Sequence, residues 1–196
     1  MTAKTAMTTA NGVAVPEAGL AAADHTLGAA HASLTLLEYG DYECPACIQA
    51  ERLMQHLVEA FGKRLRFVFR HFPLVEVHPH AELAAEAAEA AAAQGQFWAM
   101  HRLLFSHPHQ LGLPGLVAHA QSIGLDMNRF NAEMADRIYT QRIQEHRRAG
   151  ERSGIRATPS FFLNGKPVDV SFGFEKLEEA IHVALHAAPH AAISQP

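Results

Sequence analysis

Cysteine, excess charge of one sign and long apolar runs are scarce in this chain, and each shortage excludes a class of protein. Two cysteines among 196 residues are too few for a disulfide-stapled miniprotein or a four-cysteine zinc or iron–sulfur site. No run of about eighteen consecutive apolar residues occurs, so we expect no membrane insertion of this sequence. Sixteen Lys and Arg against twenty Asp and Glu leave a formal charge of -4, which argues against nucleic-acid partners. The hydrophobic content of 48% is nevertheless enough for one packed core.

The first residues lack the pattern of a secretory signal. Lys4 is followed by Thr, Asn, Gly and Pro rather than by an apolar core of about 7 to 15 residues. Small residues, Gly12 and Pro16 bury little surface against their ordering cost, which predicts a partly flexible arm over residues 1–31. We therefore expect a cytoplasmic protein, or a periplasmic one if a signal had been trimmed away.

The next segments predict one strand–helix–strand unit. The apolar run at 34–39 is typical of a strand buried on both faces. Apolar residues then recur at helical spacing from Ala50, with Gly62 suited to the C-terminal cap. Alternation over 65–70 predicts a second strand. Strand, helix and strand in about forty residues indicate a parallel, right-handed crossover.

The remainder predicts a helical insertion followed by a return to the sheet. Residues 80–154 are Ala-rich and punctuated like a series of helices. A strand at 160–163, the hairpin signal Asn164-Gly165 and a return strand with Pro167 at the sheet edge follow. A last amphipathic helix closes the chain. We thus expect one mixed α/β sheet domain, residues 32–77 and 155–190, around a helical insertion at 78–154.

Both cysteines lie in Cys44-Pro45-Ala46-Cys47, where the first strand gives way to the first helix. Residues three apart on a helix have β-carbons about 5 to 6 Å apart, so the two sulfurs can form a disulfide with small adjustment. Pro45 suits the first helical turn, where its missing N–H costs nothing. Unpaired amides and the helix dipole favour an anion at Cys44, which predicts a lowered thiol pKa and a nucleophilic role. Cys47, one turn further, suits the resolving role.

Two other interpretations of the cysteine pair stay open. A Cys-x-x-Cys zinc site would need two histidines as further ligands, because the chain has no third cysteine. The pair could also be two buried cysteines without chemistry. The position between strand and helix favours redox exchange.

Three stretches of the chain together, LLEYGDYECPAC, HPHAELAAEAAEAAAAQGQFWAMHRLLF and ATPSFFLNGKPV, resemble DsbA-like thiol oxidoreductases of the thioredoxin superfamily. The resemblance extends over about residues 24–187 and implies a thioredoxin fold with an inserted helical domain. It places the nucleophilic cysteine on Cys44, its partner on Cys47 and the cis-proline of the family on Pro159, preceded by Thr158. Pro45 and Ala46, between the cysteines, are expected to contact substrate together with Thr158 and Pro159.

Two of these positions have a physical interpretation of their own. A cis bond before Pro159 would present the backbone of Thr158 sideways, where an extended substrate could pair with it; an ordinary trans turn proline is the alternative. Glu38 is the one charged residue in the apolar strand, where a carboxylate is costly unless protonated or paired. The resemblance places the buried acid of the family there, and we expect it to relay a proton to or from Cys47. A solvated strand-end carboxylate is the alternative.

The residues around the thiols predict the redox poise. DsbA carries His where this chain has Ala46, so one contribution to a stable thiolate is absent. Asp41 and Glu43 add negative charge, which raises the pKa of a neighbouring thiol. We expect the helix terminus to prevail, giving a couple that is less oxidising than DsbA and compatible with reductase or isomerase-like exchange.

Two groups of charged residues are given no central role. The fourteen histidines, among them His71, His78 and His80, are interpreted as scattered over solvated helices and loops rather than as metal ligands. The arginines between 142 and 156 are interpreted as a solvated helix face pairing with Glu. An alternative is that these arginines attract acidic substrates or the carboxylates of glutathione.

The sequence therefore predicts a monomeric or loosely dimeric dithiol–disulfide oxidoreductase acting on protein or peptide thiols. No bound cofactor is expected, because the Cys44–Cys47 disulfide itself carries two electrons. A redox partner must recharge it: a thioredoxin- or glutathione-type reductant in the cytoplasm, or a quinone-linked membrane oxidase outside it. The rival interpretations are a non-catalytic thioredoxin-fold peptide-binding or chaperone module and, less favoured, a zinc-binding module.

Overall fold

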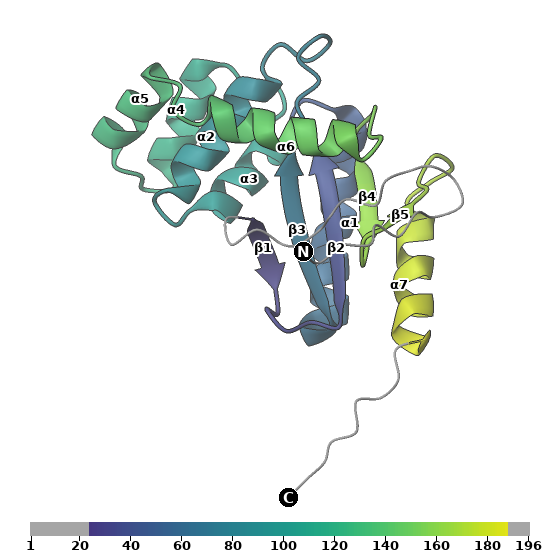
Figure 1. The fold of residues 1–196 in the computed structure, drawn as a ribbon. Helices are drawn as coiled ribbons and strands as arrows, with labels where there is room; N and C mark the ends of the chain where they lie inside the picture. The colour runs from purple at the N-terminus through teal and green to yellow at the C-terminus, as the bar shows by residue number, and fades with distance from the viewer. Residues whose placement is uncertain (1–23, 188–196) are drawn as a thin grey trace, which may run out of the picture.

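A five-stranded mixed sheet forms the centre of the computed structural model, which describes residues 24–187 (Figure 1). The strands are β1 (His25–Gly28), β2 (Leu34–Gly40), β3 (Leu65–His71), β4 (Ser160–Leu163) and β5 (Lys166–Val168). Their order across the sheet is β1-β3-β2-β4-β5. β2 and β3 are parallel, and the other neighbours are antiparallel. The predicted mixed α/β sheet is confirmed.

The predicted crossover is helix α1 (Pro45–Phe61), which links β2 to the parallel strand β3. Gly62 ends the helix with a φ of 51°, a conformation in which a side chain is unfavourable. At the other end of the sheet, Asn164 and Gly165 both have positive φ, 48° and 77°, as a type I′ hairpin requires. Pro167 lies in the edge strand β5, where a missing N–H breaks no ladder bond.

Strand β1 was not expected, because its residues fall within the predicted arm at 1–31. Residues 1–23 of that arm lie outside the described part of the chain. His25–Gly28 pairs with β3 over four residues and forms the second edge of the sheet. Four residues with no apolar alternation carry little strand signal, and only the open edge of β3 gives them a partner.

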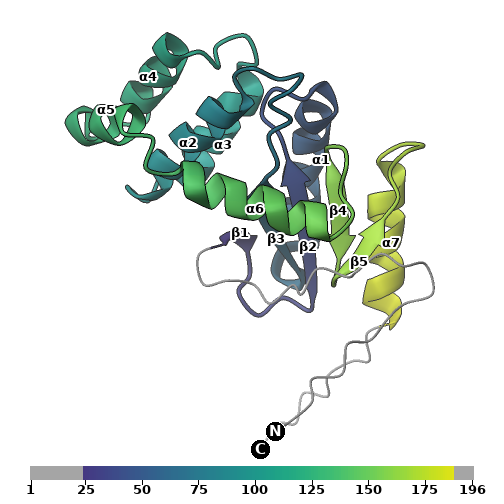
Figure 2. The ribbon, with the colours of Figure 1, turned by 45° about the horizontal axis from the view of Figure 1, so that its top comes forward.

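Helices cover both faces of the sheet. α1 and α7 (Glu175–Ala187) pack on one face, where Leu57 and Ile181 are fully buried in the larger core cluster. α6 (Thr140–Arg152) lies across the opposite face, as Figures 1 and 2 show. Gly150 permits this close approach, because a Cβ there would lie 2.7 Å from the Phe72 ring. The chain between α6 and β4 is thereby brought to the end of the sheet where α1 begins.

Four further helices gather on one side of the sheet, away from α7 (Figure 2). They are α2 (Ala81–Ala92), α3 (Phe97–Ser106), α4 (Leu113–Ser122) and α5 (Met127–Ala135). α2 packs on α3, α4, α5 and α6, and most of its alanines are buried in these contacts. The predicted run of helices between the two sheet-forming parts is therefore confirmed. Among the described residues, no helix is long and apolar enough to cross a membrane.

Candidate active site

Cys44 occupies the N-cap of α1, directly after β2 and a short turn. Its backbone is extended, with φ of -76° and ψ of 122°, and its carbonyl accepts the first helical bond from the Ile48 N–H at 3.1 Å. Pro45 fills the first helical position, as predicted. The Cys44 side chain is 7% exposed, whereas the neighbouring Pro45 is exposed and Ala46 is half-buried. The sulfur therefore lies at the helix end beside a small solvent-facing surface.

The loop before β4 faces this sulfur from a position 114 residues further along the chain. The Cys44 Sγ–H donates to the Thr158 carbonyl oxygen at 3.3 Å. The Thr158–Pro159 peptide bond is cis, in agreement with the resemblance. The Thr158 hydroxyl is buried and has no hydrogen-bond partner among the described residues. The structure thus brings together Cys44, Thr158 and Pro159.

Cys47 lies one turn deeper and is completely buried. Its sulfur accepts a hydrogen bond from the Asp41 N–H at 3.5 Å. Both cysteines are free thiols, so the structure is that of the reduced pair. The two positions differ in access, as the sequence predicted.

The two thiols also differ in acidity. Hydrogen bonding to Cys47 is the main reason why the pKa of Cys44 falls to about 5, against the opposing effect of burial; Thr158 and the amides of Ala46 and Cys47 contribute further. Burial raises the pKa of Cys47 well above its ordinary value, and the nearby Glu38 and Cys44 add to the effect. At neutral pH, Cys44 is therefore a thiolate and Cys47 a thiol.

The two acids near Cys44, Asp41 and Glu43, each have hydrogen-bond partners in the structure. Asp41 is buried, and its carboxylate accepts from the Glu43 and Leu74 N–H groups, each at 2.8 Å. His78 Nδ1 lies 2.8 Å from the same carboxylate, and His80 Nδ1 lies 3.1 Å from Glu43. Although burial opposes it, the pairing with Asp41 raises the pKa of His78, and the charge on Cys44 contributes. Asp41 and Glu43 thus each face a histidine, and neither is among the groups that set the pKa of Cys44.

Glu38 is buried in the centre of β2, which settles the choice between a solvated and a buried acid. Burial raises its pKa well above the ordinary value, and repulsion from Glu51 and Cys44 adds to this. Burial therefore favours the neutral, proton-carrying form of this carboxyl group, which is electrostatically coupled to both cysteines.

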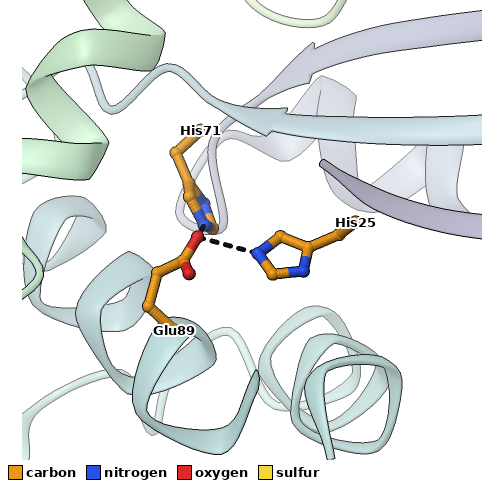
Figure 3. A group of neighbouring side chains, drawn as sticks. All are labelled: His25, His71 and Glu89. Atoms are coloured by element: carbon orange, nitrogen blue, oxygen red, sulfur yellow. Dashed lines mark hydrogen bonds and ion pairs between the residues drawn. The ribbon is translucent and has the colours of Figure 1, made fainter. Parts of the chain in front are cut away.

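The prediction that the histidines are solvated is wrong for several of them. His71, His101 and His119 are buried. His71 lies at the end of β3, and its Nε2 lies 2.9 Å from Glu89 Oε1 on α2. His25 Nε2 of β1 lies 2.8 Å from the same oxygen (Figure 3). The apolar surroundings of β3 and α2 place these imidazoles inside, and their pairing with a buried carboxylate makes burial tolerable.

The group of His25, His71 and Glu89 is the one set of three potential metal ligands within residues 24–187, with ligand atoms within 4.8 Å of one another. Two imidazole nitrogens and a carboxylate oxygen are suitable zinc ligands. However, the Arg142 guanidinium Nε lies 3.0 Å from the shared Glu89 oxygen and already supplies positive charge there. The geometry is therefore that of an ion-pair cluster. Neither cysteine belongs to such a three-ligand group in the described chain, so the geometry does not support the zinc alternative.

Comparison with known proteins places this site in a family. A protein-family model described as Thioredoxin matches residues 21–182. The chain therefore belongs to the thioredoxin family. A thioredoxin-like oxidoreductase from Silicibacter pomeroyi DSS-3 has a similar structure, with a TM-score of 0.74 and 29% identity, over 84% of this chain and 94% of that chain. Wolbachia pipientis alpha-DsbA1 has a TM-score of 0.73 at 21% identity, over 85% and 92% of the two chains. The predicted DsbA-like thioredoxin fold is confirmed.

A sequence relative carries a different name. The Na(+)/H(+) antiporter NhaA 1 of Salinispora arenicola (strain CNS-205) is 44% identical over 158 residues, which are 81% of this chain and 24% of that protein. The chain thus spans about a quarter of the length of the curated relatives it matches. The transport activity in that name describes the whole of the longer protein.

Proposed function

We propose that the protein is a dithiol–disulfide oxidoreductase that exchanges its Cys44–Cys47 pair with protein thiols and disulfides through a mixed disulfide. One observation carries the proposal: an acidic thiol at the start of α1 lies next to a buried thiol of raised pKa. A thiolate is the attacking species in disulfide exchange, and the neutral partner is held in reserve. The thioredoxin-like oxidoreductase among the structural relatives supports the same activity.

In the reducing direction, the Cys44 thiolate attacks one sulfur of a substrate disulfide. The substrate S–S bond breaks, a Cys44–substrate bond forms, and the second substrate sulfur leaves as a thiolate that takes up a proton. Cys47 then loses its proton and attacks Cys44 Sγ, which releases the first substrate sulfur. Two electrons pass to the substrate while the Cys44–Cys47 disulfide forms. The oxidising direction is the reverse of these steps.

We propose that Glu38 donates a proton to Cys47 and accepts it back. When the Cys44–Cys47 bond opens, Cys47 departs as a buried thiolate, which is costly in apolar surroundings. The neutral carboxyl of Glu38 supplies a proton at that moment, and its carboxylate accepts the proton back when the bond closes. The electrostatic coupling between the two groups supports this assignment.

Substrate binding is assigned to the surface around the Cys44 sulfur. The Thr158 carbonyl, 3.3 Å from the sulfur, lies where an extended substrate chain can pair with the backbone. Pro159 follows it, while Pro45 and Ala46 border the sulfur on the helix side. We propose no bound cofactor, since the dithiol carries the electrons. The direction follows from the partner: a thioredoxin- or glutathione-type reductant in the proposed cytoplasmic location, or a quinone-linked oxidase outside it.

Insulin reduction with dithiothreitol as the electron source tests the proposal. The wild-type chain should accelerate it, Cys44→Ser should be inactive, and Cys47→Ala should accumulate a mixed disulfide with substrate. Cys44→Ser protein that retained the full effect would refute the exchange mechanism and favour a peptide-binding or chaperone role. Titration against glutathione then gives the potential, which we still expect to be less oxidising than that of DsbA.

A further inference from the structure

An open pocket of about 700 Å³ lies between the C-terminal part of α6 and the loop that follows β3. Its apolar residues are Phe72, Leu74 and Ile155, of which Phe72 and Ile155 are buried. Its charged residues are Glu76, Glu151, Arg147, Arg148, Arg152 and Arg156. The pocket is thus an apolar floor surrounded by more positive than negative side chains.

Both carboxylates of the pocket form ion pairs with the same arginine. Arg147 lies 2.8 Å from Glu76 and 3.2 Å from Glu151. The remaining three arginines, Arg148, Arg152 and Arg156, are exposed and form no ion pair with any carboxylate in the described chain. Arg148 contacts the Gln144 side chain at 3.5 Å, and Arg156 donates to the carbonyl oxygens of Glu151 and Ile155. Three guanidinium groups are therefore available to an anionic ligand.

Two segments that line the pocket, the chain before β4 and the loop after β3, also contact the thiol site. Arg156 precedes Thr158 by two residues, and the Thr158 carbonyl lies 3.3 Å from Cys44 Sγ. In the loop after β3, the Leu74 N–H donates to Asp41, three residues before Cys44. An extended chain advances about 3.3 Å per residue, so the two-residue step from Thr158 to Arg156 corresponds to a substrate position two to four residues from the reacting cysteine.

We propose that this pocket selects thiol or disulfide substrates carrying acidic side chains two to four residues from the reacting cysteine. The inference rests on the proposed function and specifies its substrate class. A guanidinium binds a carboxylate through two parallel hydrogen bonds. The apolar floor accommodates the methylene groups of glutamate, which favours glutamate over aspartate. The -4 charge of the whole chain would by itself attract basic peptides, so a preference for acidic ones must come from this local surface.

Matched disulfide-bonded peptides test the inference. They differ only in carrying Glu, Gln or Lys two to four residues on both sides of one cysteine, and their reduction by the reduced protein is followed by acid quenching and mass spectrometry. At low ionic strength we expect the Glu peptide to react about five- to tenfold faster than the Gln peptide, and the Lys peptide more slowly than either. In 0.5 M salt the differences should shrink to about twofold or less, because the arginines are exposed.

Charge variants locate the effect. In Arg148→Gln/Arg152→Gln/Arg156→Gln protein the Glu-to-Gln rate ratio should fall to about one, whereas in the corresponding Glu triple variant the Lys peptide should become the fastest. Arg52→Gln/Lys63→Gln/Arg102→Gln removes the same charge from exposed positions elsewhere and should keep the ratio. The triple Lys variant of the pocket, which retains the charge, should largely keep it as well.

The outcomes separate this inference from the proposed function. Equal rates for all three peptides, or equal loss of the preference in the control variant, would overturn the pocket assignment and leave the exchange activity intact. No reduction of any peptide by the wild-type protein would instead refute the proposed function.

Discussion

Two regions of this molecule bury ionisable groups, and they differ in how far the buried charge is compensated by neighbouring groups. At the thiol site, hydrogen bonds rather than a directly paired cation of the described residues stabilise the charge on Cys44, and burial favours the neutral form of Glu38. In the cluster of Figure 3, Glu89 is surrounded by His25, His71 and Arg142. Burial alone raises the pKa of Glu89, but the hydrogen bonds from the two histidines outweigh it and hold the pKa far below its usual range.

The comparison separates a reactive site from a structural one. A carboxylate held by two histidines and an arginine stays ionised near neutral pH, because its pKa lies far below the usual range. Burial lowers the pKa of His146, whose ring stacks on that of His71, to about 3 and also lowers that of His71. The thiol site instead leaves its charge only partly compensated and partly accessible, which is what a nucleophile requires. In this molecule, a shifted pKa therefore indicates a functional residue only where the group can also be reached by a substrate.

The largest expected effect is the loss of stability when the cluster of His25, His71, Glu89 and Arg142 is broken. Glu89→Ala removes the acceptor shared by the buried His71 and the half-buried His25. It should lower the free energy of unfolding by about 3 kcal/mol, because removing one partner of a buried pair leaves the other groups without a compensating charge. Chemical denaturation measures it. Glu179→Ala, in an exposed pair with Lys176, is the control and should have almost no effect. A stable Glu89→Ala protein, or one with an altered Cys44 alkylation profile, would contradict the separation of the two regions.

The next effect concerns the thiolate and its pH dependence. The pKa of Cys44 is about 5 in the folded protein and near its ordinary value in the unfolded chain, so ionisation stabilises the reduced protein above pH 5. At pH 7, two units above the folded pKa, the contribution is at most about 3 kcal/mol, and it disappears as the pH falls through 5. Cys47 adds no slope there, since it is protonated in both states.

This contribution is measured as the difference in unfolding free energy between reduced wild-type and Cys44→Ser protein at pH 4.5 to 8. The difference should grow with pH. A difference independent of pH would show that the folded thiol is no more acidic than the unfolded one.

A smaller effect tests Glu38. Glu38→Gln retains the shape of the side chain but cannot exchange a proton, so the resolution of a mixed disulfide by Cys47 should slow by about tenfold. Alkylation of Cys44 at pH 7 should change little, because burial favours the neutral carboxyl of Glu38, which the uncharged amide resembles. Rapid quenching follows the resolution step over a range of pH. Equal slowing of both reactions would point to a structural role alone.

The smallest effect concerns Thr158. Its buried hydroxyl lies beside the Cys44 sulfur and contributes to the low pKa. Thr158→Val should raise that pKa and slow alkylation at pH 6 by about twofold to threefold. The stability of the reduced protein at pH 7 should fall slightly, because a higher pKa reduces the stabilisation that ionisation of Cys44 provides. Faster alkylation than in the wild-type protein would contradict this role.

Local sequence was sufficient wherever a structural feature depends on neighbours in the chain. The position of Cys44 at a helix start follows from the apolar run before it and from Pro45. The hairpin follows from Asn164-Gly165, whose positive φ values any other pair would adopt less readily. The burial of Glu38 was instead implied by the family resemblance, with a solvated carboxylate as the alternative.

Features that depend on distant contacts were missed. Nothing near His78 indicates that it faces Asp41, 37 residues away, and nothing near His25 indicates its pairing with Glu89, 64 residues away. Strand β1 exists because β3 offers it an edge. The three unpaired arginines of the pocket differ from a helix face that pairs with Glu, because Glu76 and Glu151 both pair with Arg147.

By itself, the sequence determined the reactive pair, its placement at the beginning of a helix and the class of fold, because hydrophobic periodicity, turn residues and helix capping act over a few residues. The tertiary structure alone decided which charges are compensated and which remain exposed to a substrate. That depends on how deeply each group is buried and which side chains from other elements approach it, and both are properties of the packed molecule.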